Sequence, residues 1–189
     1  MRTLLHCCRF LAGLDSAATQ VTDRETAILT RYAHTASVIV EIGTFEGKTA
    51  VALAEATAGK VFSIDPFFSG RLGFGYGEVI ARVARRRAGA QNLEYIKGFS
   101  YEAVVQFDLV IDMIFIDADH SYEGVRRDWI DWTPKLKVGG IVALHDSRIA
   151  PNSPVHLGSM DFFEREVATN PDYELIDGAD ALVVLRRLH

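Results

Sequence analysis

The sequence has few cysteines, no long apolar run and no excess of positive charge. Its 189 residues include 2 Cys and 15 Gly, too few for a small disulfide-stapled fold or a collagen-like chain. The 20 Lys and Arg are outnumbered by 25 Asp and Glu, and the net charge of −5 gives no electrostatic reason to bind a nucleic-acid backbone. The apolar runs fall far short of the ~20 residues that span a bilayer. We therefore expect neither nucleic acid nor membrane as a partner.

The N-terminal stretch at residues 3–14 is the part of the chain that most resembles a signal peptide. His6 and Arg9 interrupt it and little positive charge precedes it, so we expect a cytoplasmic protein. A disulfide between the adjacent Cys7 and Cys8 would be strained, because disulfides require specific separations and dihedral angles. Both residues fit small apolar side chains in a reducing compartment.

What is present is the pattern of one soluble domain, 1–189, in which 49% of the residues are hydrophobic and 24% charged. Thr22 and Glu25 form the S/T-x-x-E pattern that starts a helix. Asp177–Gly178 is typical of a tight turn between strands. The expected strands are 37–42, 60–65, 93–97, a part of 109–117, 141–145 after a turn at Gly139–Gly140, 173–176 and 181–187. The expected helices are 3–12, 21–34, 48–58, 78–87, 101–106, 122–136 and 160–168.

Alternation of strands with helices predicts an α/β fold with a parallel sheet and helices on both faces. The last two strands are joined by a short turn, and a parallel pair would need a long crossover. We therefore expect a Rossmann-like, doubly wound, mostly parallel seven-stranded sheet that ends in an antiparallel hairpin. Residues 1–36 would form N-terminal helices that cover the site or an interface.

The first chemical motif is the loop from Glu41 to Gly47, between the first strand of the sheet and the next helix, where open α/β sheets bind ligands. Gly43 and Gly47 allow a tight turn and a close approach to a ligand. The spacing differs from the G-x-G-x-x-G dinucleotide pattern and from a phosphate loop. The acid before the first glycine favours a cationic ligand, and a plain strand-to-helix turn is the alternative.

The second motif is Asp65, which ends the second strand. A carboxylate there can accept hydrogen bonds from two ribose hydroxyls, or it can simply start a turn before Pro66. Together, E-x-G-x-x-x-G and this acid resemble the class I S-adenosylmethionine-dependent methyltransferases over roughly residues 20–189. The resemblance implies S-adenosylmethionine as cofactor. Its implied binding residues are Glu41, Gly43, Thr44 and Gly47 near the methionine part, Asp65 at the ribose, Gly98 and Ser100 at the adenine, and Asp117.

The third motif joins two strand ends, Asp117 with His120 and, further along, His145 with Asp146. About one helix and one strand separate them, so both emerge at the carboxyl edge of neighbouring strands. Carboxylates suit a hard divalent cation such as Mg²⁺, and a histidine shifts the preference toward Mn²⁺. The alternative is that His120 lies in a surface loop and that His145–Asp146 is only a strand-end turn.

This arrangement resembles the metal-dependent O-methyltransferases of the catechol and macrolide-sugar types. The resemblance implies that Asp117, His145 and Asp146 hold the metal and that His120 is the general base. His145 departs from the family pattern, which has a carboxylate at its position. The implied reaction is methyl transfer to a hydroxyl group of a small molecule such as a sugar, polyphenol or secondary metabolite. Oligomeric state stays open, with a homodimer as one option.

Two other functions are weighed against this one. A metal-independent small-molecule methyltransferase would use His145 and Asp146 only to shape the pocket, and a non-catalytic module would bind S-adenosylmethionine without transferring its methyl group. Among the remaining features, we expect Asp119 to cap the helix that follows it. The basic run 82–87 is interpreted as the solvated end of a helix, and the aromatic loop 67–77 as a lid or a core-covering loop.

Overall fold

The computed structural model describes residues 2–69, 75–149 and 155–189. Parts of the aromatic loop at 67–77 therefore lie outside the described residues. Within the described ranges, no helix is long and apolar enough to cross a membrane.

Seven strands form one sheet in the order β3-β2-β1-β4-β5-β7-β6. Strands β1 to β5 are parallel to one another, and β7 is antiparallel to both β5 and β6. This confirms the predicted Rossmann-like, doubly wound sheet with its C-terminal antiparallel hairpin. The strands are β1 Val38–Ile42, β2 Lys60–Asp65, β3 Leu93–Lys97, β4 Ile111–Ile116, β5 Leu136–Leu144, β6 Tyr173–Ala179 and β7 Leu182–Arg187.

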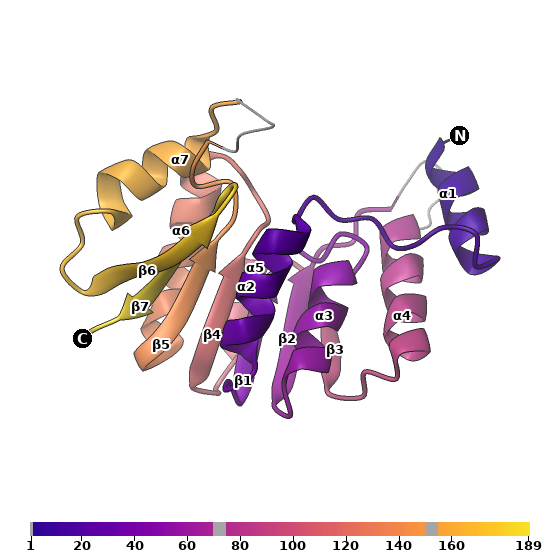
Figure 1. The fold of residues 1–189 in the computed structure, drawn as a ribbon, viewed down its shortest axis with the longest axis horizontal. Helices are drawn as coiled ribbons and strands as arrows, with labels where there is room; N and C mark the ends of the chain where they lie inside the picture. The colour runs from indigo at the N-terminus through magenta and orange to yellow at the C-terminus, as the bar shows by residue number, and fades with distance from the viewer. Residues whose placement is uncertain (1, 70–74, 150–154) are drawn as a thin grey trace.

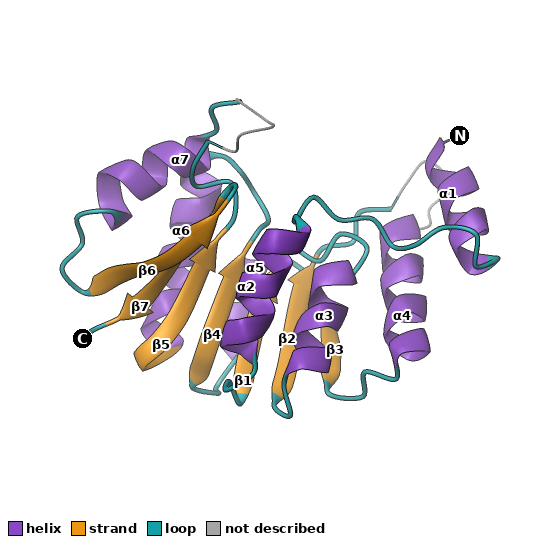
Figure 2. Ribbon diagram, in the orientation of Figure 1, coloured by secondary structure: helices purple, strands orange, loops and turns teal. Residues whose placement is uncertain are grey.

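Helices cover both faces of the sheet (Figures 1 and 2). The α-helices are α1 Arg2–Leu11, α2 Asp23–Ala33, α3 Lys48–Ala56, α4 Tyr76–Ala88, α5 Ser100–Ala103, α6 Tyr122–Trp132 and α7 Gly158–Phe162. Short 3-10 turns lie at η1 Val104–Gln106 and η2 Thr133–Lys135, and a π-helical turn lies at η3 Phe163–Val167.

Alternation of side chains along the strands divides the core in two. Phe115 of β4 packs in the cluster that contains residues of α2, α3 and α4, whereas its neighbours Ile114 and Ile116 pack in the cluster beneath α6 and α7. Trp129 and Trp132 of α6 belong to this second cluster. Each strand of the sheet centre is therefore buried on both faces, as apolar parallel strands require.

The predicted start of α2 is confirmed in atomic detail. The Thr22 side chain accepts a hydrogen bond from the Glu25 amide, and the Glu25 side chain accepts one from the Thr22 amide. This reciprocal capping box satisfies two amides that the helix itself leaves without partners.

Two predicted turns are wrong. Gly139–Gly140 lies inside β5, where an irregularity sets residues 137–140 of β5 against the single residue Asp112 of β4, between the pairs Ile111–Leu136 and Met113–Ile141. A positive φ of 76° at Gly139 absorbs the bend without ending the strand. Gly178 likewise stays paired in β6, and the hairpin turns at Asp180–Ala181 instead, where Asp180 has a φ of 47°.

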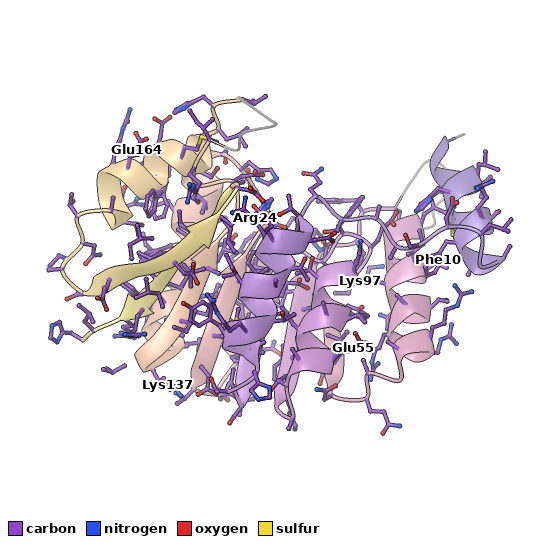
Figure 3. The ribbon with its side chains drawn as sticks, viewed as in Figure 1. Phe10, Arg24, Glu55, Lys97, Lys137 and Glu164 are labelled. Atoms are coloured by element: carbon purple, nitrogen blue, oxygen red, sulfur yellow. The ribbon has the colours of Figure 1, made fainter. Side chains whose placement is uncertain are left out.

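Helix α1 packs on α4, away from the main core, and Figure 3 shows Phe10 between the two helices. Arg87 donates hydrogen bonds to the carbonyls of Phe10 and Leu11 at 2.9 Å, and its guanidinium lies 4.8 Å from the Phe10 ring centroid. The expectation that residues 82–87 are only a solvated helix end is therefore wrong for Arg87, because it caps the carbonyl end of another helix.

The strand order reverses between β1 and β4, which are neighbours in the sheet although they are far apart in the chain. Crossovers leave β1 and β4 toward opposite sides of the sheet, and a crevice opens at their carboxyl ends. Arg24 marks this end of the molecule in Figure 3, and Lys137 at the start of β5 marks the opposite end. A binding site is therefore expected above the ends of β1, β2 and β4.

Candidate active site

A cavity of about 770 Å³ lies at the carboxyl ends of β1 to β4. The loops that follow these strands line it, together with residues 18–20 between α1 and α2. Six of the eight residues predicted to bind the cofactor line this cavity, namely Gly43, Thr44, Asp65, Gly98, Ser100 and Asp117. The other two, Glu41 and Gly47, are buried just behind the cavity wall.

The two glycines of the loop after β1 are needed for packing as well as for turning. A Cβ on Gly43 would lie 2.1 Å from the Asp117 carbonyl oxygen, and a Cβ on Gly47 would lie 2.5 Å from the Tyr95 hydroxyl. Both residues also have positive φ, 96° and 78°. The sequence suggested close approach to a ligand, whereas the structure shows that the closest approach at these positions is to the protein itself.

Glu41 is a buried carboxyl group, 1% exposed, beneath this loop. The Ser63 hydroxyl donates a hydrogen bond to it, and Ser63 Oγ lies 2.5 Å from Thr44 Oγ1. Burial raises the pKa of Glu41 to about 8, although the hydrogen bond from Ser63 opposes this shift. Glu41 is thus linked to the cavity wall through two hydroxyl groups rather than by direct exposure.

Asp65 ties the ends of β1 and β2 together. Its Oδ2 accepts hydrogen bonds from the backbone amides of Thr44 and Phe45 at 2.9 and 3.1 Å, and its Oδ1 accepts one from Phe67 at 2.6 Å. The carboxylate lines the cavity while it holds the loop. Asp65 therefore has a structural role that the sequence motif alone did not reveal.

The end of β3 brings an aromatic pair and a buried acid to the cavity. The rings of Phe99 and Tyr101 stack with centroids 5.2 Å apart, and Arg127 lies 4.5 Å from the Tyr101 centroid. Ser100 donates a hydrogen bond to Asp128 of α6. Burial raises the pKa of Asp128 to about 6, which the hydrogen bond from Ser100 partly offsets. An acid and a hydroxyl thus lie side by side next to the aromatic pair.

Three of the residues singled out after β4 and β5 converge. Asp117, His120 and Asp146 each present one ligand atom, and these atoms lie within 4.8 Å of one another. His120 Nδ1 is 3.0 Å from Asp146 Oδ2. The close contact with Asp146 raises the pKa of His120, and the contact with His120 holds the pKa of Asp146 well below its usual range. Asp146 reaches this position through a φ of 50°, which is uncommon for a residue other than glycine.

His145 points away from the cavity, into the protein. It is 5% exposed, and its Nε2 lies 3.3 Å from Glu25 Oε2 on α2. Its Nδ1 lies 3.0 Å from Asp117 Oδ1 and 3.5 Å from Asp146 Oδ2. Burial alone would lower the pKa of His145, but these three carboxylates raise it to about 12.

The donor set fits a divalent cation. Asp117 and Asp146 supply carboxylate oxygens and His120 a ring nitrogen, the ligand types that Mn²⁺ accepts and that Mg²⁺ accepts in part. His145 Nδ1 is buried and, within the described residues, has no aligned hydrogen-bond partner. Because the neighbouring carboxylates favour the charged ring, Nδ1 could bind a metal only after it loses its proton.

The cavity also fits the expected cofactor in kind. Its volume of about 770 Å³ is in the range of small-molecule sites, and the acids Asp65, Asp117 and Asp128 line it. Residues 18–20 close it from the N-terminal side. There Glu46 of the loop after β1 accepts a hydrogen bond from the Ala18 amide at 2.5 Å and lies 3.0 Å from His6 Nε2.

Sequence reasoning missed several of these residues. Glu25 was identified only as a cap, and Glu46, Asp128 and the stacked aromatic pair were not singled out as parts of a site. The prediction that Asp119 caps α6 is wrong, because Ser121 is the N-cap and Asp119 Oδ1 accepts from the Ser121 amide at 2.8 Å. Glu46 lies directly before Gly47 in the loop after β1, and its place in that loop could have marked it as part of the site. No local pattern marks the contact between Glu25 and His145, which are far apart in the sequence.

A comparison with known protein families matches the central part of the chain. A family model described as "Methyltransferase domain" matches residues 40–147, which include the loop after β1 and both strand ends that carry Asp117 and Asp146. Among curated proteins, the uncharacterized protein y4gI of Sinorhizobium fredii (strain NBRC 101917 / NGR234) is 28% identical over 123 residues. These residues are 59% of this chain but only 13% of that protein.

Solved structures share the fold over nearly the whole chain. An O-methyltransferase from Bacillus cereus in complex with SAH has a TM-score of 0.71 at 20% identity, over 99% of this chain and 91% of that one. TomG from Streptomyces achromogenes, an O-methyltransferase of tomaymycin synthesis in complex with SAM, has 0.69 at 19%, over 100% and 91%. An rRNA methylase from Streptococcus thermophilus has 0.65 at 15%, over 92% and 100%. At such identities the likeness shows the fold alone.

Proposed function

This chain belongs to the methyltransferase domain family, within the class I S-adenosylmethionine-dependent methyltransferases, and from that premise we propose that it methylates a hydroxyl group of a small molecule. The observation that carries the proposal is the His120–Asp146 pair beside Asp117, since it supplies a base for a hydroxyl proton. The net charge of −5 and the cavity of about 770 Å³ favour a small acceptor over an RNA, although one solved structure of this fold is an rRNA methylase.

The chain's own groups account for cofactor binding. S-adenosylmethionine would supply a methyl group activated by a sulfonium. Thr44 and Gly43 would face its methionine part, Asp65 its ribose, and Gly98 with Ser100 its adenine, as the resemblance implies. Because Asp65 already holds the loop amides of Thr44 and Phe45, the cavity wall is shaped before a ligand enters.

His120 is the proposed general base. Asp146 Oδ2 lies 3.0 Å from His120 Nδ1, so Nε2 is the ring nitrogen that would accept a proton from the acceptor hydroxyl. The carboxylate also stabilises the imidazolium that forms, which is the logic of a histidine oriented by an acid in other enzymes. His120 is partly exposed and lines the cavity, as a base that meets an acceptor must.

A divalent cation is the second part of the proposal. Asp117 and Asp146 would hold it with a histidine nitrogen, from His145 as the sequence suggests or from His120. A bound cation lowers the pKa of a coordinated hydroxyl. The competing function is methyl transfer without a metal. The His120–Asp146 pair favours this alternative, because Asp146 can orient the ring of His120 without a metal ion.

The architecture proposed for the whole chain is one methyltransferase domain, residues 1–189, in which residues 1–36 cover the site. The lining of the cavity by Ala18, Thr19 and Gln20 supports this role. The acceptor would contact these residues and the loops after β4 and β5.

The decisive experiment incubates the protein with S-adenosylmethionine and a panel of sugars, polyphenols and other hydroxyl compounds, and measures S-adenosylhomocysteine. We expect product with at least one acceptor, loss of activity on chelation, and recovery with Mg²⁺ or Mn²⁺. Unchanged activity in chelator would establish the metal-independent reaction instead. Cofactor binding in calorimetry without turnover on any acceptor would leave a binding module.

A further inference from the structure

Glu25 is a fully buried carboxylate, 0% exposed, at a junction of three elements. Its Oε1 accepts a hydrogen bond from the Ala181 amide of the β6–β7 turn at 2.8 Å. Its Oε2 accepts one from the Thr22 amide at 2.7 Å and lies 3.3 Å from His145 Nε2 at the end of β5.

The capping box does not by itself explain a carboxylate at this position. One side-chain oxygen is enough to accept from the Thr22 amide, and glutamine serves in capping boxes as well as glutamate. Glu25 uses its second oxygen and its charge elsewhere, on Ala181 and His145. Burying a carboxylate is costly unless it is paired and hydrogen-bonded. Among the partners of Glu25, His145 is the one that can carry a positive charge.

The orientation of the His145 ring is restricted by its neighbours. It is packed edge-on against Phe115, with centroids 6.3 Å apart and planes at 80°. A half-turn about its Cβ–Cγ bond would exchange ring nitrogen for carbon at both faces. The contact between Nε2 and Glu25 selects the orientation in which Nδ1 faces Asp117 and Asp146, at 3.0 and 3.5 Å.

We propose that Glu25 is a positioning residue of the methyl-transfer site: by accepting from His145 Nε2 it holds Nδ1 in the gap between the Asp117 and Asp146 carboxylates. The role of Glu25 in methyl transfer rests on the proposed function, whereas the experiments that test the position of the His145 ring do not. Carboxylates that accept from the outer nitrogen of a metal-ligating histidine fix its tautomer and orientation, and their loss weakens metal binding. Glu25 would thereby connect α2 and the C-terminal hairpin to the cation site.

The test compares Glu25→Gln with Thr22→Ala. Glutamine keeps the size of the side chain, but it has one acceptor oxygen for the amides of Thr22 and Ala181 and lacks the negative charge that faces His145. Thr22→Ala removes the N-cap hydroxyl and leaves the Glu25 carboxylate in place, so it is the matched control for a loss of helix stability. Both variants are expected to unfold at lower temperature than the wild-type protein, and therefore unfolding alone cannot distinguish a cap from a positioning residue.

Mn²⁺ alone, titrated into each protein without cofactor or acceptor, gives the first readout. Glu25→Gln should weaken Mn²⁺ binding about 10- to 100-fold, whereas Thr22→Ala should leave it at the wild-type value. Equal affinities for the wild type and Glu25→Gln would overturn the proposal, and so would an equal loss in Thr22→Ala.

Imidazole ¹H–¹⁵N spectra give the second readout and apply even if the wild-type protein binds no Mn²⁺. The His145 signals, assigned by their absence in His145→Gln, should show a protonated, slowly exchanging Nε2 in the wild type and in Thr22→Ala. They should shift in Glu25→Gln, and a spectrum unchanged by that substitution would contradict the proposal. Neither readout involves an acceptor, so failure of methyl transfer would disprove the proposed function without deciding the role of Glu25.

Discussion

The Cα of Gly43 faces the backbone of Asp117 so closely that a Cβ at residue 43 would lie 2.1 Å from the Asp117 carbonyl oxygen. The loop after β1 and the end of β4 are thus in direct backbone contact at the floor of the cavity. Asp117 also takes part in the proposed cation site. The absence of a side chain at Gly43 therefore allows the short distance between the loop after β1 and this site.

Gly43→Ala should displace the two strand ends and destabilise the fold by several kcal/mol, since both the clash and the φ of 96° oppose a side chain. Gly89→Ala is the matched control, because Gly89 has a φ of 66° but open space where its Cβ would lie. It should cost only about 1 kcal/mol. Chemical unfolding of both variants tests this, and equal losses would show that the contact with Asp117 is unimportant.

His120→Ala should lower kcat about 10²- to 10⁴-fold, the range for loss of a general base, while the Kd for S-adenosylmethionine stays the same. His34→Ala is the control, because His34 ends α2 and its side chain faces the Ala56 carbonyl. Steady-state kinetics with calorimetry separates the two effects. Turnover that survives in His120→Ala would mean that another group accepts the proton.

Asp65→Ala should raise the Kd for S-adenosylmethionine about 10- to 100-fold, because hydrogen bonds to a charged group contribute about 1.5–3 kcal/mol. Part of the loss would come from the loop amides of Thr44 and Phe45, which lose their acceptor. Asp108→Ala, which changes an exposed acid, should bind the cofactor as the wild type does. An unchanged Kd in Asp65→Ala would exclude a role at the ribose.

Glu41 should make the cofactor-free protein less stable as pH rises from about 4.5 to about 8. Below 4.5 the residue is protonated in both states, whereas in this window only the unfolded chain releases its proton, because burial raises the folded pKa to about 8. Glu41→Gln should remove this slope, a difference of a few kcal/mol in the free energy of unfolding by pH 8. Urea titrations at pH 5 and pH 8 measure it.

The exposed Glu55 at the far end of α3, labelled in Figure 3, provides the comparison for that experiment. Glu55→Gln should keep the wild-type slope. If Glu41→Gln and the wild type lose stability in parallel with pH, Glu41 is ionised in the folded protein at neutral pH.

The sequence predicted most of the sheet because its signals are local. Strands β2 and β3 have the expected bounds, and the capping box at Thr22 and Glu25 starts α2 where the pattern indicated. Glycines were harder to interpret. Gly139 and Gly178 were expected in turns, yet both lie within strands, because a bulge or a neighbour's backbone can use a glycine as well as a turn can.

The site was predictable in part for the same reason. Six predicted residues line one cavity because they follow strand ends, and parallel strands bring their carboxyl ends to one edge. Contacts that depend on side chains from distant elements were not visible. Glu25 and His145 are 120 positions apart in the sequence. The hydrogen bonds from Arg87 to the carbonyls of Phe10 and Leu11 join residues that are separated by 77 and 76 positions.

The attachment of α1 has a consequence for how the molecule opens. Its buried residues Cys7 and Phe10 share a small cluster with Ala17 and Ile80 that is separate from the two main cores. A segment that buries so little can unfold by itself at a fraction of the global free energy. Residues 2–17 would then act as an independent folding unit, and their amides would exchange with solvent while the sheet stays intact.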